Sequence, residues 1–176
     1  PNWLMMKVTE ALPENSVVVN EALTSTRDLN ALRPYRDRYD FHAFASGGIG
    51  WAVPAAVGIQ LADMNRPVCA IIGDGSAMYS IQALWTAAHM KLPMTYIITN
   101  NSSYRILKQR LLSFHGNDNF IGMDLNDPPI DFTAIARGMG VTATRVTEAE
   151  DVVPALRAAF ANPGPNLLDI AVDSHV

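Results

Sequence analysis

The stretch from Val68 to Arg110, VCAIIGDGSAMYSIQALWTAAHMKLPMTYIITNNSSYRILKQR, decides the fold of this chain. An apolar run over 68–72 stops at Gly73-Asp74-Gly75, and a second over 94–99 stops at Asn100-Asn101-Ser102-Ser103. Short β-rich runs with a helical segment between them predict parallel strands of an α/β sheet. Ligands of such sheets bind beyond the carboxyl ends of the strands, which is where both polar clusters fall.

The residues of these clusters favour a divalent metal ion bound to a diphosphate. Asp74 offers one anionic oxygen, Asn101 offers a carbonyl oxygen, and the short loop after Asn101 offers backbone carbonyls; Mg²⁺ and Ca²⁺ prefer such oxygen ligands. A single carboxylate leaves Mg²⁺ short of negative charge, which a diphosphate would supply. We expect Gly75 and Ser76 to open a helix whose N–H groups and positive dipole end face the same place.

This arrangement of residues resembles the thiamine diphosphate signature. In this sequence, GDGS at 73–76 is followed by NN at 100–101, with 24 residues, 76–99, between Gly75 and Asn100. The flanking segments ASGGIGWAVPAAVG (45–58) and NNSSYRILKQRL (100–111) extend the resemblance. Together they are similar to the cofactor-diphosphate (PP) domain of the decarboxylase/acetolactate-synthase group, and most similar to benzoylformate decarboxylase.

The resemblance implies a three-layer α/β/α fold around a central, mostly parallel sheet. Residues 1–176 would be one PP domain, the C-terminal fragment of a longer enzyme. The implied cofactors are thiamine diphosphate and Mg²⁺, and the implied reaction is that of a carboxy-lyase acting on a 2-oxo acid. In the family, the glutamate that activates the cofactor comes from a pyrimidine-binding domain of the same or a neighbouring subunit. We therefore expect no catalytic residue in this chain, an inactive isolated domain and a homo-oligomer.

The resemblance also implies the residues of the site. Those expected to bind the cofactor are Thr24, Ser25, Gly47, Gly48, Ile49, Gly73, Asp74, Gly75, Ser76, Asn101, Ser103 and Tyr104, with Asp74, Asn101 and Ser103 on the metal. Ile49 would support the bent cofactor, and the backbone near Gly47 would bond its aminopyrimidine. Structural interpretations stay open for some of them, because Thr24 and Ser25 also suit helix capping and the glycine block suits a close-packed turn. Glu21 is a tempting local glutamate, but it sits at the diphosphate end of the motif and is not assigned as the activating one.

Three functions remain open at this point. The first is a 2-oxo-acid decarboxylase similar to benzoylformate decarboxylase, and the second is a carboligase of the acetolactate-synthase type. The third is a non-catalytic module that binds Mg²⁺ and a nucleotide. Ile106 and Arg110 bear on the substrate, because some benzoylformate decarboxylases carry a small residue and an aromatic residue at these positions. These two differences argue against benzoylformate itself.

Length and composition set bounds on this interpretation. The 176 residues are one domain's worth, 49% of them are hydrophobic, and the net charge of −4 argues against a nucleic-acid partner. The single cysteine, Cys69, lies in an apolar strand and is expected to be a buried small side chain. No apolar run reaches the roughly 20 residues that span a membrane, and no signal-peptide pattern is present, so we expect a cytoplasmic protein. The chain begins at Pro1 without a methionine, which indicates an excised fragment.

Apolar periodicity and turn residues predict the remaining elements. We expect strands over 16–19, 41–45, 141–146 and 167–172, and helices over 2–12, from Gly50 to Met64, and over 81–90, 104–114, 131–138 and 148–161. A further helix is expected to follow Thr24-Ser25-Thr26. The long polar segment 113–129 is expected to be a loop that helps to close the site.

Overall fold

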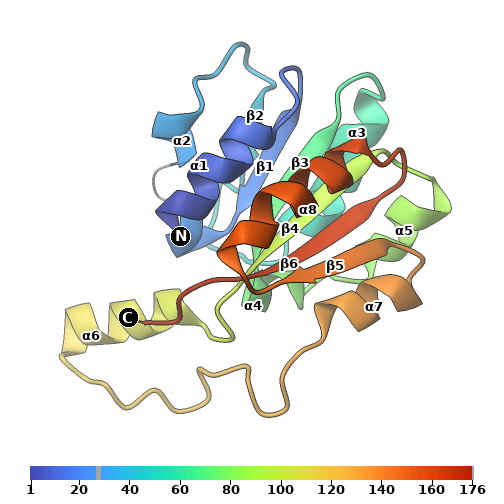
Figure 1. Ribbon diagram of the computed structural model, residues 1–176. Helices are drawn as coiled ribbons and strands as arrows, with labels where there is room; N and C mark the ends of the chain where they lie inside the picture. The colour runs from blue at the N-terminus through green and yellow to red at the C-terminus, as the bar shows by residue number, and fades with distance from the viewer. Residues whose placement is uncertain (27–28, 176) are drawn as a thin grey trace.

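In the computed structural model, which describes residues 1–26 and 29–175, one parallel sheet forms the centre of the fold (Figure 1). Its six strands lie in the order β2-β1-β3-β4-β6-β5, and every neighbouring pair is parallel. The strands are β1 (Val17–Glu21), β2 (Phe41–Ala43), β3 (Val68–Gly73), β4 (Met94–Asn100), β5 (Thr142–Val146) and β6 (Asn166–Ala171). The central strands are apolar on both sides because helices cover both faces.

Two hydrophobic clusters, one on each face of the sheet, hold the three layers together. Helices α3 (Ala52–Ala62), α5 (Ala83–His89) and α7 (Phe132–Gly138) pack on one face, where Tyr96 and Ile98 are fully buried. Helices α1 (Asn2–Ala11), α2 (Leu29–Leu32) and α8 (Ala149–Ala161) pack on the other, where Cys69 and Ile71 are buried. The predicted α/β/α fold is confirmed, and the sheet is wholly parallel. Cys69 is a buried free cysteine, and this burial raises the pKa of its thiol to about 12.

The bounds of most predicted elements differ from the observed ones by no more than two residues, and two helices differ in kind. The helix expected to open at Gly75 is a single turn, α4 (Asp74–Ala77), and α5 begins only at Ala83. Gly75 and Ser76 do lie in the first turn of a helix, so the expected helix start is present although this helix is shorter than expected. After β1 the chain forms the 3₁₀ turn η1 (Leu23–Thr26); the helix expected beyond it falls partly on residues 27–28, outside the described part of the chain.

The strand order places a crevice at the carboxyl edge of the sheet. From β1 the chain adds β2 on one side, and the later strands β3 and β4 extend the sheet on the other. Loops after β1 and β3 therefore leave in different directions, which is where α/β sheets bind ligands. The remaining helix, α6 (Arg105–His115), follows β4 and projects from the body of the molecule beside this edge (Figure 1).

Candidate functional site

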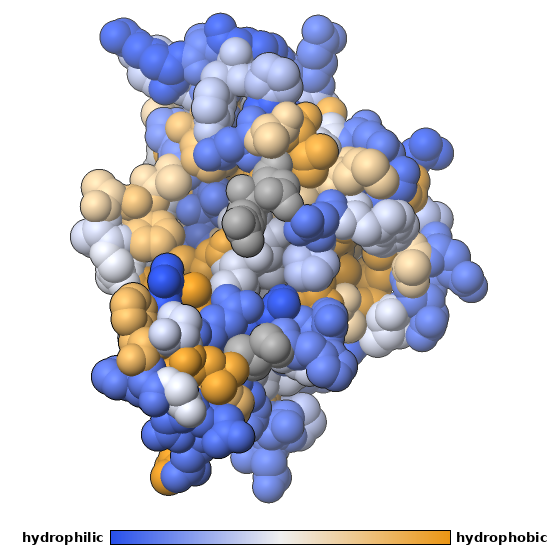
Figure 2. Space-filling model, turned by 90° about the vertical axis from the view of Figure 1, so that its left-hand side faces the viewer, coloured by the Kyte–Doolittle hydropathy of each residue, from blue (hydrophilic) through white to orange (hydrophobic). Residues whose placement is uncertain are grey.

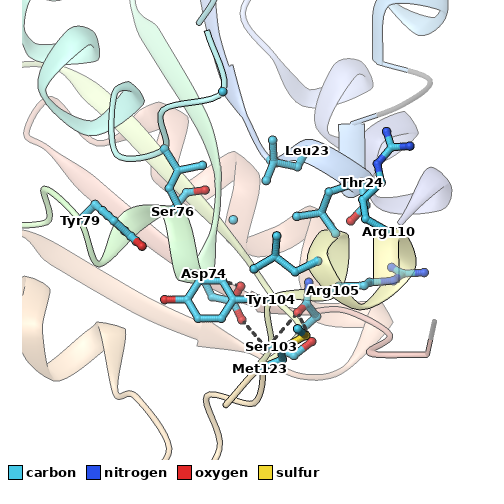
Figure 3. Close-up of a pocket in the computed structure, with 18 of the residues that line it drawn as sticks. Leu23, Thr24, Asp74, Ser76, Tyr79, Ser103, Tyr104, Arg105, Arg110 and Met123 are labelled. Atoms are coloured by element: carbon cyan, nitrogen blue, oxygen red, sulfur yellow. Dashed lines mark hydrogen bonds between the residues drawn. The ribbon is translucent and has the colours of Figure 1, made fainter. Parts of the chain in front are cut away.

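Asp74 and Asn101 converge on one backbone group at the ends of β3 and β4. The N–H of Ser103 donates to Asn101 Oδ1 at 3.0 Å and to Asp74 Oδ2 at 3.3 Å (Figure 3). The Ser103 hydroxyl also donates to Asn101 Oδ1, and the N–H of Gly75 donates to Asp74 Oδ1. Since two oxygens that accept from one N–H must lie near each other, the carboxylate and the carboxamide face a common space. This is the proximity that the strand-end clusters predicted.

The Ser103 carbonyl is left free to face the same space. A short antiparallel bridge pairs Ser103 with Asp124, and in it Tyr104 N–H donates to the Met123 carbonyl and Leu125 N–H donates to the Ser102 carbonyl. These bonds use the groups on either side of Ser103, so its own N–H and carbonyl point away from the paired segment. The Ser103 carbonyl accepts no hydrogen bond from residues 1–26 or 29–175. Three oxygen atoms of the kind Mg²⁺ prefers, from Asp74, Asn101 and the Ser103 carbonyl, therefore belong to one small region at the ends of β3 and β4.

Asp74 is the acidic group of this cluster, and it is only 3% exposed. Burial raises the pKa of its carboxyl group, and backbone N–H groups, including that of Gly75, partly offset the rise. A cation beside this carboxylate would favour its ionised form. Among the described residues no three His, Cys, Asp or Glu side chains gather to hold a metal ion. A metal ion bound here would therefore need neutral oxygens and an anionic ligand besides Asp74.

A cavity of about 710 Å³ opens from these groups, within the usual size of a ligand site (Figure 3). Ten of the twelve residues expected to bind a cofactor line it: Thr24, Gly47, Ile49, Gly73, Asp74, Gly75, Ser76, Asn101, Ser103 and Tyr104. The Tyr104 ring covers Gly75 so closely that a Cβ atom there would lie 2.5 Å from the ring. The glycine at this position is therefore required by packing.

Two expected residues do not line the cavity. Ser25 lies in η1, where each residue turns by about 120°, so that Thr24 faces the cavity while Ser25 is directed inward. Its side chain is 1% exposed, and its hydroxyl finds no partner among the described residues. Gly48 is exposed beside the cavity wall, and its N–H lies 3.5 Å from the Ser46 hydroxyl. Neither position supports the contact expected of it.

Glu21 has a structural role that its position in the sequence does not reveal. Its carboxylate is fully buried and accepts hydrogen bonds from the N–H groups of Gly50 and Ala52, where α3 begins. Gly50 has a φ of +95°, and a Cβ atom there would lie 2.5 Å from Tyr79. Glu21 therefore anchors the glycine block that carries Gly47 and Ile49. This role is recognised from a buried carboxylate that faces the start of a helix, and that arrangement is visible only in the folded structure.

Two lining residues, Leu23 and Tyr79, escaped the sequence analysis. Leu23 and Tyr79 form part of the wall, and the loop 121–123 closes one side through Met123. This loop is tied to the body by the bridge at Ser103 and by an ion pair between Lys108 and Asp124. The loop belongs to the segment 113–129, whose expected contribution to closing the site agrees with its place in the cavity wall.

Helix α6 supplies the far wall of the cavity. Arg105, Ile106 and Arg110 all line it, and Arg105 also donates to the Asp173 carbonyl at 3.3 Å. Arg110 lies over the ring of Phe114. Apart from Asp74, the described residues that line the cavity include no carboxylate, and the side formed by α6 carries the cationic Arg105 and Arg110.

Most of the chain matches one known protein family. The profile of the family described as "Thiamine pyrophosphate enzyme, C-terminal TPP binding domain" matches residues 24–170. The chain belongs to this family. Membership of this family accounts for both the fold and the GDG…NN motif. The family binds thiamine diphosphate, usually with Mg²⁺ at the diphosphate.

Individual relatives of this thiamine diphosphate-binding domain carry different names. The chain is 42% identical over 170 residues to IlvX of Mycobacterium tuberculosis, a protein named "Putative acetolactate synthase large subunit IlvX". It is 38% identical over 164 residues to benzoylformate decarboxylase of Pseudomonas aeruginosa. These matches cover 94% and 93% of the chain but 33% and 30% of the relatives. A solved 4-hydroxybenzoylformate decarboxylase of Rhodococcus jostii superposes with a TM-score of 0.91 at 36% identity, over 98% of this chain and 32% of that one. The chain thus spans about a third of these relatives.

Proposed function

We propose that this domain holds the diphosphate of thiamine diphosphate through Mg²⁺, as the cofactor-binding part of a 2-oxo-acid decarboxylase. The observation that carries the proposal is the convergence of Asp74 and Asn101 on the Ser103 N–H at the mouth of the cavity. The donor set fits the group, because one carboxylate and two neutral oxygens leave Mg²⁺ with charge for a diphosphate to neutralise. Family membership supports the cofactor, and the neighbouring decarboxylases support the reaction.

The residues of the chain would divide the work of holding the cofactor. Asp74, Asn101 and the Ser103 carbonyl would bind the metal, and the Thr24 and Ser76 hydroxyls line the cavity where a diphosphate would accept hydrogen bonds. Ile49 projects from the segment anchored by Glu21 and would support the bent form of the cofactor. When bound, thiamine diphosphate would supply a nucleophilic carbon for the 2-oxo group and an electron sink for the bonding pair that remains when CO₂ leaves.

The activating glutamate is proposed to come from a pyrimidine-binding domain of the same or a neighbouring subunit. Glu21 does not suit the task, because its carboxylate is already bonded to the start of α3. Phe114 and Ile121, which are 72% and 80% exposed, lie on or next to α6 and suit contact with a further domain. Figure 2, which views the side from which α6 projects in Figure 1, shows hydrophobic residues among hydrophilic ones on the lower part of this face. We therefore propose a homo-oligomer and an inactive isolated chain.

A carboligase of the acetolactate-synthase type is the second candidate, favoured by the 42% identity to IlvX. The two reactions share the same cofactor site and differ in the step after CO₂ is lost. Arg110 lines the cavity, so the assayed substrates should include a 2-oxo dicarboxylic acid beside benzoylformate and pyruvate. Among the described helices none is long and apolar enough to cross a membrane, and the cytoplasmic location stays a prediction that cell fractionation would test.

Calorimetry with the full-length protein tests the cofactor assignment. Thiamine diphosphate should bind only with Mg²⁺, whereas ATP and NAD with Mg²⁺ should not bind; binding of ATP instead would favour the nucleotide module. Asp74→Ala should abolish the Mg²⁺-dependent binding, because it removes the metal ligand that carries charge. Unchanged affinity in that variant would refute the site. Release of an aldehyde from a 2-oxo acid would then distinguish a decarboxylase from a carboligase, which joins two such molecules.

A further inference from the structure

A buried carboxylate on β6, that of Asp169, contacts the end of β4 just before the loop Asn101–Ser103 that carries two of the proposed metal ligands. Asp169 is 1% exposed, and its Oδ1 accepts a hydrogen bond from Asn100 Nδ2 at 2.8 Å. The other oxygen, Oδ2, lies 3.5 Å from a guanidinium nitrogen of Arg145, which is half exposed, and makes no hydrogen bond within the described residues. Burying a carboxylate is costly when few groups bond to it. Its position next to Asn100 therefore calls for an explanation beyond stability.

Asn100 transmits this contact to the turn that follows β4. Its side-chain oxygen accepts hydrogen bonds from the Ser102 N–H at 3.1 Å and from the Ser102 hydroxyl at 3.2 Å. A carboxylate can only accept hydrogen bonds, so Asp169 fixes which end of the Asn100 carboxamide points toward Ser102. The Asn100 backbone carbonyl accepts from Val172 N–H, so the main chain and the side chain of Asn100 are both held by the segment 169–172.

Ser102 adopts a backbone conformation that side chains other than glycine rarely take. Its φ is +54°, in the left-handed region, which is unfavourable unless other contacts hold it. The turn at Ser102 directs the N–H of Ser103 toward Asp74 and Asn101, and the Ser103 carbonyl accepts no hydrogen bond from the described residues. The geometry of the proposed ligands therefore depends on the two bonds that Asn100 makes to Ser102.

We propose that Asp169 is a positioning residue for the metal–diphosphate site. It orients Asn100, Asn100 holds Ser102 in the left-handed turn, and the turn sets the spacing of the three metal ligands. This inference rests on the proposed function, since it concerns the same site. Partners that orient metal ligands typically change metal affinity by 10–100-fold when they are removed, although they never touch the metal.

The identity of the metal ion separates positioning from general stability. Mg²⁺ demands near-ideal octahedral geometry with bonds of about 2.1 Å, whereas Ca²⁺ accepts longer bonds and irregular geometry. A loosened turn should therefore weaken Mg²⁺ more than Ca²⁺. A loss of folded protein would weaken both ions equally, because it lowers the concentration of the site and leaves its shape unchanged.

The test is a metal titration of the full-length protein in the presence of thiamine diphosphate, followed by calorimetry, with folding checked by circular dichroism. Asp169→Leu should weaken Mg²⁺ binding by 10–100-fold and Ca²⁺ binding by less than about fivefold. Asn166→Ala is the matched control, since Asn166 is buried at the opposite end of β6 and donates to the carbonyls of Ala159 and Gly164. It should leave both affinities within twofold.

Two further variants keep the test decisive if Asp169→Leu does not fold. Asp169→Asn is nearly isosteric but can donate as well as accept, so it should weaken Mg²⁺ binding by a smaller factor. Ser102→Gly in that background should restore much of the affinity, because glycine takes the left-handed turn without a steric penalty. Failure of Ser102→Gly to restore any affinity would count against the role of the turn.

The outcomes separate this inference from the proposed function. If the wild-type protein shows no Mg²⁺-dependent binding of thiamine diphosphate, the proposed function fails. If the wild-type protein binds, the positioning role is refuted by folded Asp169 variants that keep Mg²⁺ affinity within threefold, or that lose Mg²⁺ and Ca²⁺ affinity to the same extent.

Discussion

The buried carboxylate of Glu21 gives the most direct test of how the cofactor cavity is built. Its two oxygens accept the N–H groups of Gly50 and Ala52, and no water reaches them because the side chain is fully buried. Glu21→Gln keeps one acceptor oxygen but turns an NH₂ group toward the second N–H. One charge-assisted hydrogen bond is lost, and a buried donor then faces another donor.

The expected size of the effect follows from these two bonds. A hydrogen bond to a charged group contributes about 1.5–3 kcal/mol, so Glu21→Gln should lower the free energy of unfolding by roughly that amount. For a chain of this length, 1 kcal/mol shifts the melting temperature by about 2–4 °C, which predicts a fall of about 3–12 °C. Affinity for thiamine diphosphate should also fall, because the released segment carries Gly47 and Ile49 into the cavity.

The assay is thermal unfolding by circular dichroism, with and without Mg²⁺ and thiamine diphosphate. The control is Glu10→Gln, which makes the same chemical change at an exposed residue paired with Lys7 on α1. Exposed pairs of this kind contribute at most about 1 kcal/mol, so the control should melt within a few degrees of wild type. A Glu21→Gln protein that melts together with the control would refute the anchoring role.

Three further predictions concern the core and the charges. Gly75→Ala should destabilise the protein by about 1–3 kcal/mol in urea unfolding, because the added Cβ would lie 2.5 Å from the Tyr104 ring. Gly58→Ala, at a helical position of α3 with open space around it, should instead stabilise the protein by about 0.5–1 kcal/mol. Hydrogen bonds from two arginine side chains hold the pKa of Asp40 below its ordinary value of 3.8, so its contribution to stability is complete above that value and is lost as the pH falls below 3.8 toward the folded pKa. Asp40→Asn should remove this part of the acid dependence below pH 3.8, and an unchanged dependence would refute it. Burial raises the pKa of Asp74, so the metal-free protein should lose stability as the pH rises from 3.8 through the folded pKa of this carboxyl group. Asp74→Asn should remove this loss, and its unfolding should no longer respond to Mg²⁺ with thiamine diphosphate. A retained response would contradict the site.

The sequence was sufficient for the features that depend on local pattern. Apolar runs that end at Gly73-Asp74-Gly75 and Asn100-Asn101 predicted two parallel strands, and the shared edge of such strands predicted that Asp74 and Asn101 would meet. The placement of Thr24 and Ile49 along the cavity depended on the family resemblance. The helix expected over 131–138 is observed as α7, and Asp131 caps it by accepting a hydrogen bond from the Ala134 N–H.

Features that join distant parts of the chain could not be predicted in this way. Glu21 bonds to residues 29 and 31 positions away, and Asp169 bonds to Asn100 across 69 positions. Such contacts leave no periodic signal, because a buried acid looks like any other acid in the sequence. The close contact of the Tyr104 ring with Gly75 joins positions 29 residues apart and was likewise not visible in the sequence.

The single carboxylate of the site links metal binding to cofactor binding. Mg²⁺ beside Asp74, Asn101 and the Ser103 carbonyl would keep one uncompensated positive charge in a buried place, and a diphosphate alone would face the Asp74 carboxylate. Each partner removes the electrostatic penalty of the other, so their affinities rise together and by the same factor. A second acid at this edge would let the metal bind alone, and the domain would then hold a cation whether or not the cofactor was present. With the proposed ligands, the sparse donor set would therefore favour metal binding in the cofactor-bound state.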